Sequence, residues 1–308
     1  MQQPLTSTPV GHLRDYIKLM RLDRPIGIYL LLWPALWTLW ISAEGTPPLK
    51  ILSIIVAGGI LMRSAGCVIN DYADRKLDGH VARTKDRPMA TGRVSKFEAL
   101  TLFGLLAMMA FALVLMLNTL TIMMSVVGLL LAMSYPFMKR FHYLPQIHLG
   151  VAFGWAIPMA HTAVTEQLPD TSTWLIFLAA ILWTTAYDTI YAMVDREDDL
   201  KMGMKSTAIL FGDLDKAIIG VLQLMFLLCL YLLGQSIDLP KSFYIGLGVA
   251  AFLLVYQQFL LRLRRPDECF RAFLNNNLVG MAIFIGIAWP SIVQNSPKIV
   301  DLARALLT

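Results

Sequence analysis

The sequence predicts an all-helical integral membrane protein. Of its 308 residues, 57% are apolar and only 15% are charged, whereas soluble domains carry roughly 25% charged residues. The apolar residues also gather in stretches close to the length of about 20 residues that a helix needs to cross hydrocarbon. No stretch has the composition of a soluble domain, so we expect residues 1–308 to form a single intramembrane domain.

Nine apolar stretches follow one another along the chain, joined mostly by short polar segments. Their ranges are 26–43, 50–70, 97–117, 119–136, 146–164, 172–193, 216–235, 242–261 and 273–293. Two connections are longer, near 71–96 and 194–215, and they hold most of the acidic residues considered below. We therefore expect nine transmembrane helices, with the site chemistry at the ends of the second and the sixth.

The distribution of basic residues predicts the orientation of these helices. A net charge of +5 could indicate a nucleic-acid-binding protein, but the basic residues gather on alternate connections, which is the positive-inside pattern. The opposite side holds only Lys50, Lys241, Lys298 and Arg304. We expect the N-terminus and both long connections to lie in the cytoplasm, and we infer neither a nucleic-acid nor a protein partner.

The first acidic cluster closes the second apolar stretch. If that helix continues, Asp71, Asp74 and Asp78 share one face at i, i+3 and i+7, with Asn70 one turn from Asp74. Like charges at helical spacing repel, and charges within a membrane are costly. Mg²⁺ would remove both problems because it binds hard oxygen ligands and bridges carboxylates to phosphates. The alternative is a solvated loop edge.

A second acidic cluster closes the sixth stretch. Asp188, Asp195 and Asp199 fall at i, i+7 and i+11, again on one helical face, and Tyr191 lies near it. Asp188 is inside an apolar stretch, where an ionisable residue indicates a functional site. The repetition of an acidic cluster at the end of an apolar stretch indicates two related halves of the chain, about 15–145 and 146–293. Two facing clusters could hold Mg²⁺ ions that clamp a diphosphate.

Basic and amide residues near the two clusters are candidate partners. Lys139 offers a point charge to a phosphate, and Arg140 a planar fork suited to a carboxylate, unless both only flank the membrane. Arg63, inside the second stretch, needs either the diphosphate or a salt bridge to an aspartate. The asparagines 275–277 open the last stretch and either cap its helix or line the cavity.

The chemistry that these residues indicate is departure of a diphosphate leaving group, and if the group it leaves is allylic, C–O cleavage gives a carbocation. Cations stabilise the departing diphosphate, a membrane-buried pocket keeps water from the carbocation, and aromatic faces stabilise it. An electron-rich arene then attacks. The candidate wall residues are Tyr72, Tyr135, Tyr187, Tyr191, Phe137 and Phe153.

The motifs resemble those of a known family. Asn70-Asp71-x-x-Asp74-x-x-x-Asp78 with Asp195-x-x-x-Asp199 resembles the paired motifs of the UbiA superfamily of intramembrane prenyltransferases, and Tyr135-x-x-x-Lys139 resembles its third motif. The longer strings 70–80, 187–196, 205–212 and 20–27 are similar to the ubiquinone-pathway branch, whose members act on 4-hydroxybenzoate.

The resemblance implies a nine-helix bundle around a central cavity open to lipid, in a bacterial inner membrane with the site toward the cytoplasm. It implies Mg²⁺ on Asn70, Asp71, Asp74, Asp78, Asp195 and Asp199. Arg63, Asn70, Tyr135, Lys139, Asp188 and Tyr191 are expected to bind the substrates. Lys139 would touch the diphosphate, Arg140 would take the benzoate carboxylate, and Asp195 would activate the phenol.

The implied reaction joins a polyprenyl group from its diphosphate to the ring carbon ortho to the hydroxyl of 4-hydroxybenzoate. Two alternatives stay open at this point. One is a different acceptor, such as a naphthoate, homogentisate or haem. The other is a cation-coupled transporter that uses its intramembrane carboxylates, although such sites usually lie near the membrane midplane.

Overall fold

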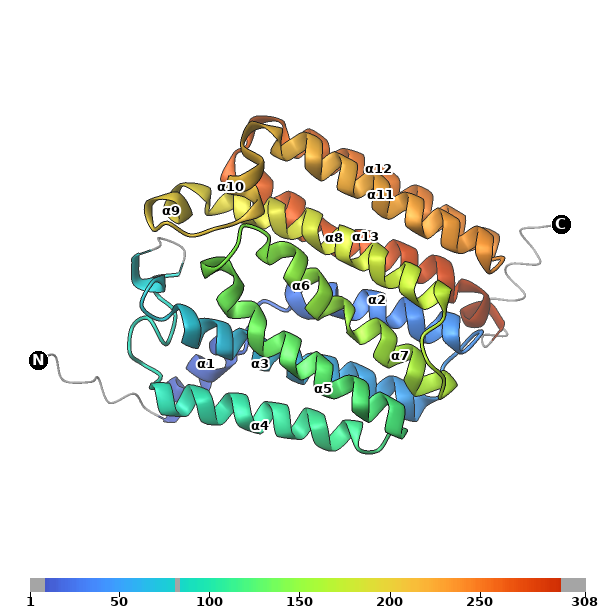
Figure 1. Ribbon diagram of the computed structural model, residues 1–308, viewed down its shortest axis with the longest axis horizontal. Helices are drawn as coiled ribbons and strands as arrows, with labels where there is room; N and C mark the ends of the chain where they lie inside the picture. The colour runs from blue at the N-terminus through green and yellow to red at the C-terminus, as the bar shows by residue number, and fades with distance from the viewer. Residues whose placement is uncertain (1–8, 81–83, 295–308) are drawn as a thin grey trace, which may run out of the picture.

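The computed structural model describes residues 9–80 and 84–294, and every regular element in these ranges is helical (Figure 1). The α-helices are α1 (Pro9–Leu19), α2 (Ile26–Ser42), α3 (Leu49–Asp74), α4 (Lys96–Val114), α5 (Thr119–Ser134), α6 (Pro145–Gly154), α7 (Ala156–Thr165), α8 (Thr171–Val194), α9 (Arg196–Lys201), α10 (Thr207–Phe211), α11 (Asp215–Ser236), α12 (Lys241–Leu260) and α13 (Pro266–Gln294). Short 3-10 helices are η1 (Asp78–His80), η2 (Tyr135–Arg140), η3 (Gly212–Leu214) and η4 (Leu261–Leu263). The predicted all-helical class is confirmed over the described ranges. Lys298 and Arg304, which entered the charge pattern, lie outside them.

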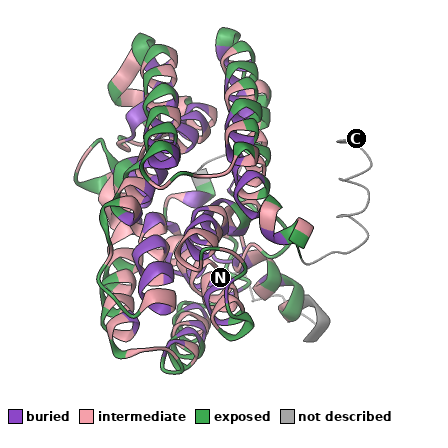
Figure 2. Cartoon of the chain, turned by 90° about the vertical axis from the view of Figure 1, so that its right-hand side faces the viewer, coloured by how far each residue is buried: buried purple, intermediate pink, exposed green. Residues whose placement is uncertain are grey.

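The outer surface of the bundle has the composition of a surface in lipid. Within the described ranges, eight helical segments are long and apolar enough to cross a membrane, and α2 is a shorter apolar helix of 17 residues. Large apolar side chains such as Phe252, Val255 and Leu224 are exposed to about two thirds or more, and exposed residues follow the outward faces of the helices (Figure 2). Soluble monomers rarely expose apolar patches of this extent. The chain is a multi-pass membrane protein.

The two long connections lie at the same end of the bundle. In Figure 1, α9, α10 and η1 gather at the end where α1 also lies, and the opposite end carries the turns between α4 and α5, α7 and α8, and α11 and α12. This arrangement agrees with the alternation of basic residues along the sequence. It brings segments that are more than 100 residues apart to one end of the molecule.

Side-chain caps fix where several helices begin. Ser95 accepts a hydrogen bond from the Glu98 backbone N–H, and the Glu98 carboxylate accepts one from the Ser95 N–H, which makes a capping box at α4. Asn118 and Asp170 cap α5 and α8 with a single backbone bond each, in which the side chain accepts from the backbone N–H three residues later. These starts confirm the expected third, fourth and sixth stretches to within a few residues.

The fifth predicted stretch is two helices and not one. α6 ends at Gly154 and α7 begins at Ala156. Pro158 explains the break because proline lacks an N–H and its ring crowds the carbonyl four residues earlier. Trp155, at the junction, donates its indole N–H to the Met124 carbonyl at 2.8 Å, so the kink is held against α5.

The helices that carry the acidic clusters end sooner than the one-face argument required. α3 ends at Asp74, where the Leu77 N–H bonds the Asp74 carbonyl at 2.7 Å and the Arg75 side chain bonds the Tyr72 carbonyl. Terminal carbonyls satisfied in this way no longer favour a further helical turn. Asp78 therefore opens η1, and Asp199 lies in α9 after a break at Asp195. The shared-face prediction holds for Asp71 and Asp74 and is wrong for Asp78 and for the second cluster.

The last helix begins at Pro266, about two turns before the predicted start. The asparagines 275–277 therefore lie in its interior and do not cap it, nor do they line the central cavity described below. They tie helices together instead. Trp183 donates to Asn276 at 2.8 Å and Trp33 to Asn277 at 2.9 Å, and Gln257 donates to Asn275 at 3.0 Å. Both predicted roles for these asparagines are wrong.

Gly246 allows a close crossing of α12 and α13, and its replacement by alanine is expected to destabilise the protein. A Cβ at Gly246 would lie 2.5 Å from the Ala282 carbonyl oxygen, a backbone atom that cannot swing away. Overpacking of this kind costs about 1–3 kcal/mol. Denaturant unfolding in detergent should show the loss. Gly248→Ala, two residues along α12 with no atom within 4 Å of its Cβ position, is the matched control and should not destabilise.

Candidate functional site

A cavity of about 670 Å³ runs into the bundle from the end that carries the long connections. One face of α3 lines it along most of that helix, with residues at spacings of three and four. These are Ile54, Ile55, Gly58, Gly59, Met62, Arg63, Gly66, Cys67, Asn70, Asp71 and Asp74. Twenty residues of α-helix rise about 30 Å, which is the thickness of the hydrocarbon core. The lining is acidic and basic at one end and apolar at the other.

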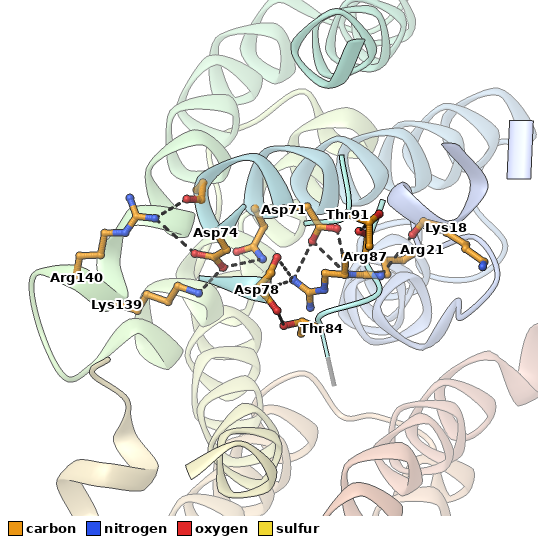
Figure 3. A network of polar contacts seen from close by, with 12 residues as sticks. Lys18, Arg21, Asp71, Asp74, Asp78, Thr84, Arg87, Thr91, Lys139 and Arg140 are labelled. Atoms are coloured by element: carbon orange, nitrogen blue, oxygen red, sulfur yellow. Dashed lines mark hydrogen bonds and ion pairs between the residues drawn. The ribbon is translucent and has the colours of Figure 1, made fainter. Parts of the chain in front are cut away.

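Asp71 and Asp78 are buried and share one arginine. Arg87 places its guanidinium 3.0 Å from Asp71 and 3.0 Å from Asp78, and Arg21 lies 3.1 Å from Asp71 (Figure 3). Burial raises the pKa of the Asp78 carboxyl above its ordinary value, and Arg87 partly opposes that shift. Arg87 thus forms ion pairs with both carboxylates, although Asp78 lies in η1 and not in α3.

Asp74 joins the first cluster to the third motif. Its carboxylate pairs with Lys139 from η2 and accepts a hydrogen bond from the Asn70 amide at 3.4 Å. One oxygen, Oδ1, is buried without a hydrogen bond and lies 3.6 Å from the Arg140 guanidinium. Asp74 is only 2% exposed, so this oxygen is a buried acceptor that has an ion-pair partner, Arg140, but no hydrogen bond.

Arg140 lies beside the cavity and does not line it. Its guanidinium donates to the Ala73 carbonyl at 2.6 Å and stands over the Phe137 ring at 5.6 Å. Lys139, its neighbour, does line the cavity. The two adjacent basic residues therefore face different surroundings, which their positions in the sequence did not distinguish.

The second cluster lines the same cavity although it does not share a helical face. Asp188 lies within α8, Asp195 at the junction of α8 and α9, and Asp199 within α9, and all three are lining residues. The backbone of Lys205 donates to the Lys139 carbonyl at 3.2 Å, which joins the connection after Asp199 to the third motif. The predicted meeting of the two clusters at one cavity agrees with this placement.

Of the six predicted aromatic wall residues, three line the cavity: Tyr135, Tyr191 and Phe153. The other three do not. Tyr187 packs edge-on to Trp183 in the core at 5.3 Å, Tyr72 lies beneath Arg75 at 4.4 Å, and Phe137 beneath Arg140. Their prediction as wall residues is wrong, because residues adjacent in a helix, such as Tyr187 and Asp188, point to different faces and only one face lines the cavity. Phe270 and Phe273 of α13 complete the wall and were not predicted.

Arg63 stands on the cavity wall between the charged and the apolar ends. It donates to the Cys67 sulfur at 2.6 Å and lies over the Phe153 ring at 5.4 Å. Its Nε is buried without a hydrogen bond, and within the described residues it forms no ion pair, so the predicted salt bridge to an aspartate is not formed. Gly27 makes room for it, since a Cβ there would clash with the Arg63 Nη2.

Three site residues were not predicted from the sequence. Arg21 and Arg87 belong to the basic residues of the positive-inside pattern, and the structure shows that both also form ion pairs with Asp71. Arg21 has a φ of 57°, which is uncommon for a residue other than glycine. The buried Asp215 was also missed. It pairs with Arg196 at 3.0 Å and Arg264 at 2.9 Å, and so anchors the chain directly after Asp195.

Among the described residues, no three carboxylate, imidazole or thiol groups stand close enough to hold one ion together. The reason is visible in the first cluster, where basic side chains from the turn after α1, from η2 and from the connection before α4 form ion pairs with the carboxylates. A metal ion that binds here would compete with Arg21, Arg87 and Lys139.

This fold and site define a class, that of polytopic membrane proteins whose cavity is lined by acidic and basic side chains at one end and is otherwise apolar. The model of the UbiA prenyltransferase family matches residues 31–284, and the chain belongs to that family.

Curated relatives and solved structures agree. The chain is 59% identical over 280 residues to the 4-hydroxybenzoate octaprenyltransferase of Alkalilimnicola ehrlichii, covering 90% of this chain and 95% of the relative. It is 58% identical to that of Photobacterium profundum, covering 91% and 98%. A UbiA homologue from Aeropyrum pernix superposes with a TM-score of 0.75 at 25% identity, covering 84% and 96%. One from Archaeoglobus fulgidus, bound to GPP and Mg²⁺, has a TM-score of 0.69 at 16% identity, covering 90% and 99%, and shows the fold alone.

Proposed function

We propose that this protein transfers a polyprenyl group from polyprenyl diphosphate to the ring carbon ortho to the hydroxyl of 4-hydroxybenzoate. The products are 3-polyprenyl-4-hydroxybenzoate and diphosphate, in ubiquinone biosynthesis. The observation that carries the proposal is the cavity, which places charged groups at one end and an apolar path at the other. The curated relatives, named for this activity, supply the acceptor.

The donor set fits Mg²⁺. Carboxylate and amide oxygens are the hard ligands that this ion prefers, and the Oδ1 of the lining residue Asp74, which accepts no hydrogen bond, offers one. We assign the ion to Asn70, Asp71, Asp74, Asp78, Asp195 and Asp199, all of which line the cavity. When bound, Mg²⁺ would neutralise the charge that develops on the diphosphate leaving group.

The chain's own residues then govern the two reacting partners. Lys139 donates to the diphosphate, and Arg21 and Arg87, once displaced from Asp71, are within reach of the same anion. The rings of Tyr135, Tyr191 and Phe153 line the cavity, where they exclude water and stabilise the allylic cation. Asp195 accepts the phenol proton of the acceptor, which makes the ring electron-rich when it attacks.

We assign the acceptor carboxylate to Arg63. It lines the cavity, has an unpartnered Nε and makes no ion pair with a described residue, so an anion there would satisfy a buried cation. The resemblance assigned that role to Arg140. Its guanidinium is engaged by the Ala73 carbonyl outside the lining, which favours a supporting role beside Asp74.

We infer nine membrane crossings, with α2 as the first, the N-terminus in the cytoplasm and the site facing it in a bacterial inner membrane. With 17 residues α2 is at the short end of the spanning range of about 17–25. The pseudo-repeat of residues 15–145 and 146–293 stays a prediction.

The purified chain, incubated with Mg²⁺, 4-hydroxybenzoate and a radiolabelled polyprenyl diphosphate, tests the proposal. Labelled prenyl-hydroxybenzoate and free diphosphate should form, EDTA should stop the reaction, and added Mg²⁺ should restore it. Transfer of the label to a naphthoate, homogentisate or haem instead would overturn the assignment of 4-hydroxybenzoate as the acceptor. Cation flux in proteoliposomes without any prenyl transfer would overturn the assignment of the protein as a prenyltransferase.

A further inference from the structure

Beyond Arg63 the cavity is apolar and continues along α3 for several turns. Its far part is bounded by Ile54 and Ile55 of α3, Ala110 and Val114 of α4, and Met159 of α7. Among the described residues, no charged side chain lines this part, so its chemistry suits a hydrocarbon. On the proposed function, on which this inference rests, the hydrocarbon is the tail of the donor.

Two glycines of α3 face open space in this cavity at different depths. Gly66 and Gly58 both line it, and a Cβ built on either meets no atom within 4 Å. At 1.5 Å per residue, Gly66 lies about 8 Å and Gly58 about 20 Å along α3 from Asp71. Gly59 differs, because its Cβ would lie 2.8 Å from the Leu32 side chain. Gly58 is therefore open toward the cavity while its neighbour is packed.

The depth of Gly58 corresponds to a definite length of donor tail. An isoprene unit contributes four bonds of roughly 1.5 Å each, and so advances about 5 Å when extended. A tail that starts at the diphosphate beside Asp71 reaches the level of Gly58 at about the fourth unit. Tails of two or three units end before it, and longer tails must pass it.

We propose that Gly58 is a specificity-determining residue for donor length: the missing side chain leaves the passage through which tails of more than about four isoprene units run. A bulky side chain at this position would narrow the passage without touching the charged end. The variant should then discriminate by length, since only long tails meet the obstruction. The same change at Gly66 should affect every donor, because that position is level with the first or second unit.

The test compares geranyl diphosphate, with two units, and octaprenyl diphosphate, with eight, as donors for the wild type and for Gly58→Phe. We expect kcat/KM for the octaprenyl donor to fall at least about tenfold, and that for the geranyl donor to stay within about threefold. Gly66→Phe should lower both. Gly248→Phe, at an exposed α12 position with open space around its Cβ and outside the cavity lining, should change neither.

Equal loss on both donors in a Gly58→Phe protein that melts like the wild type would overturn the inference, as would no loss on either, which would place the exit of the tail before Gly58. If Gly58→Phe does not fold, Gly58→Leu gives the same comparison with a smaller side chain. A wild type that transfers from neither donor would overturn the proposed function itself, and this inference with it.

Discussion

Asp74→Asn is expected to lower kcat/KM for prenyl transfer by at least about 10²–10³-fold. The buried carboxylate pairs with Lys139, contacts Asn70 and has one oxygen that accepts no hydrogen bond. The amide keeps the shape of the side chain and removes its charge. It therefore weakens the site for a divalent cation, and it replaces a charge-assisted bond to Lys139 by a neutral one.

Two measurements separate this effect from misfolding. Mn²⁺ binding, followed by electron paramagnetic resonance, should weaken in Asp74→Asn, while the melting temperature in detergent changes far less than turnover does. Asp213→Asn makes the same chemical change at an exposed position outside the cavity lining and should leave both turnover and Mn²⁺ binding as in the wild type. Wild-type turnover in Asp74→Asn would contradict the metal assignment.

Residues on one helix were predictable from the sequence, because their relation is a matter of spacing. Helical periodicity predicts that Asp71 and Asp74 share one face of α3. Hydropathy predicts the intramembrane positions of Asp188 and Arg63. Asp78 and Asp199 joined the site by another route, through turns that ended the helices after Asp74 and Val194. The residue types were a better guide than the geometry assumed for them.

Contacts between distant segments left no periodic signal. Arg21 meets Asp71 across 50 positions and Lys139 meets Asp74 across 65. A basic residue beside a membrane helix is already explained by the positive-inside rule, so nothing in the sequence separates Arg87, which bridges two carboxylates, from Arg93, which pairs with Asp15. The same limit applies to Asn276, whose partner Trp183 lies 93 residues away.

Arg63→Ala is expected to raise KM for 4-hydroxybenzoate by about 10–100-fold, the range for a lost charge-assisted hydrogen bond of roughly 1.5–3 kcal/mol. The guanidinium lines the cavity with its Nε unsatisfied, whereas the diphosphate end is served by Lys139 and the aspartates. KM for the polyprenyl diphosphate should therefore change much less. Gly27→Ala should give a milder form of the same effect, since its methyl group would displace the guanidinium.

An acceptor without the carboxylate charge identifies the cause. Wild type should prefer 4-hydroxybenzoate to 4-hydroxybenzamide, and Arg63→Ala should lose most of that preference, because a neutral amide gains little from the arginine in the first place. Arg140→Ala is the matched control: the same residue type is removed from η2, at a position outside the cavity lining, and the preference for the acid should persist. If Arg140→Ala lost the preference and Arg63→Ala kept it, Arg140 and not Arg63 would be the residue that binds the acceptor carboxylate. That result would also mean that η2 turns its arginine into the cavity when the substrates bind.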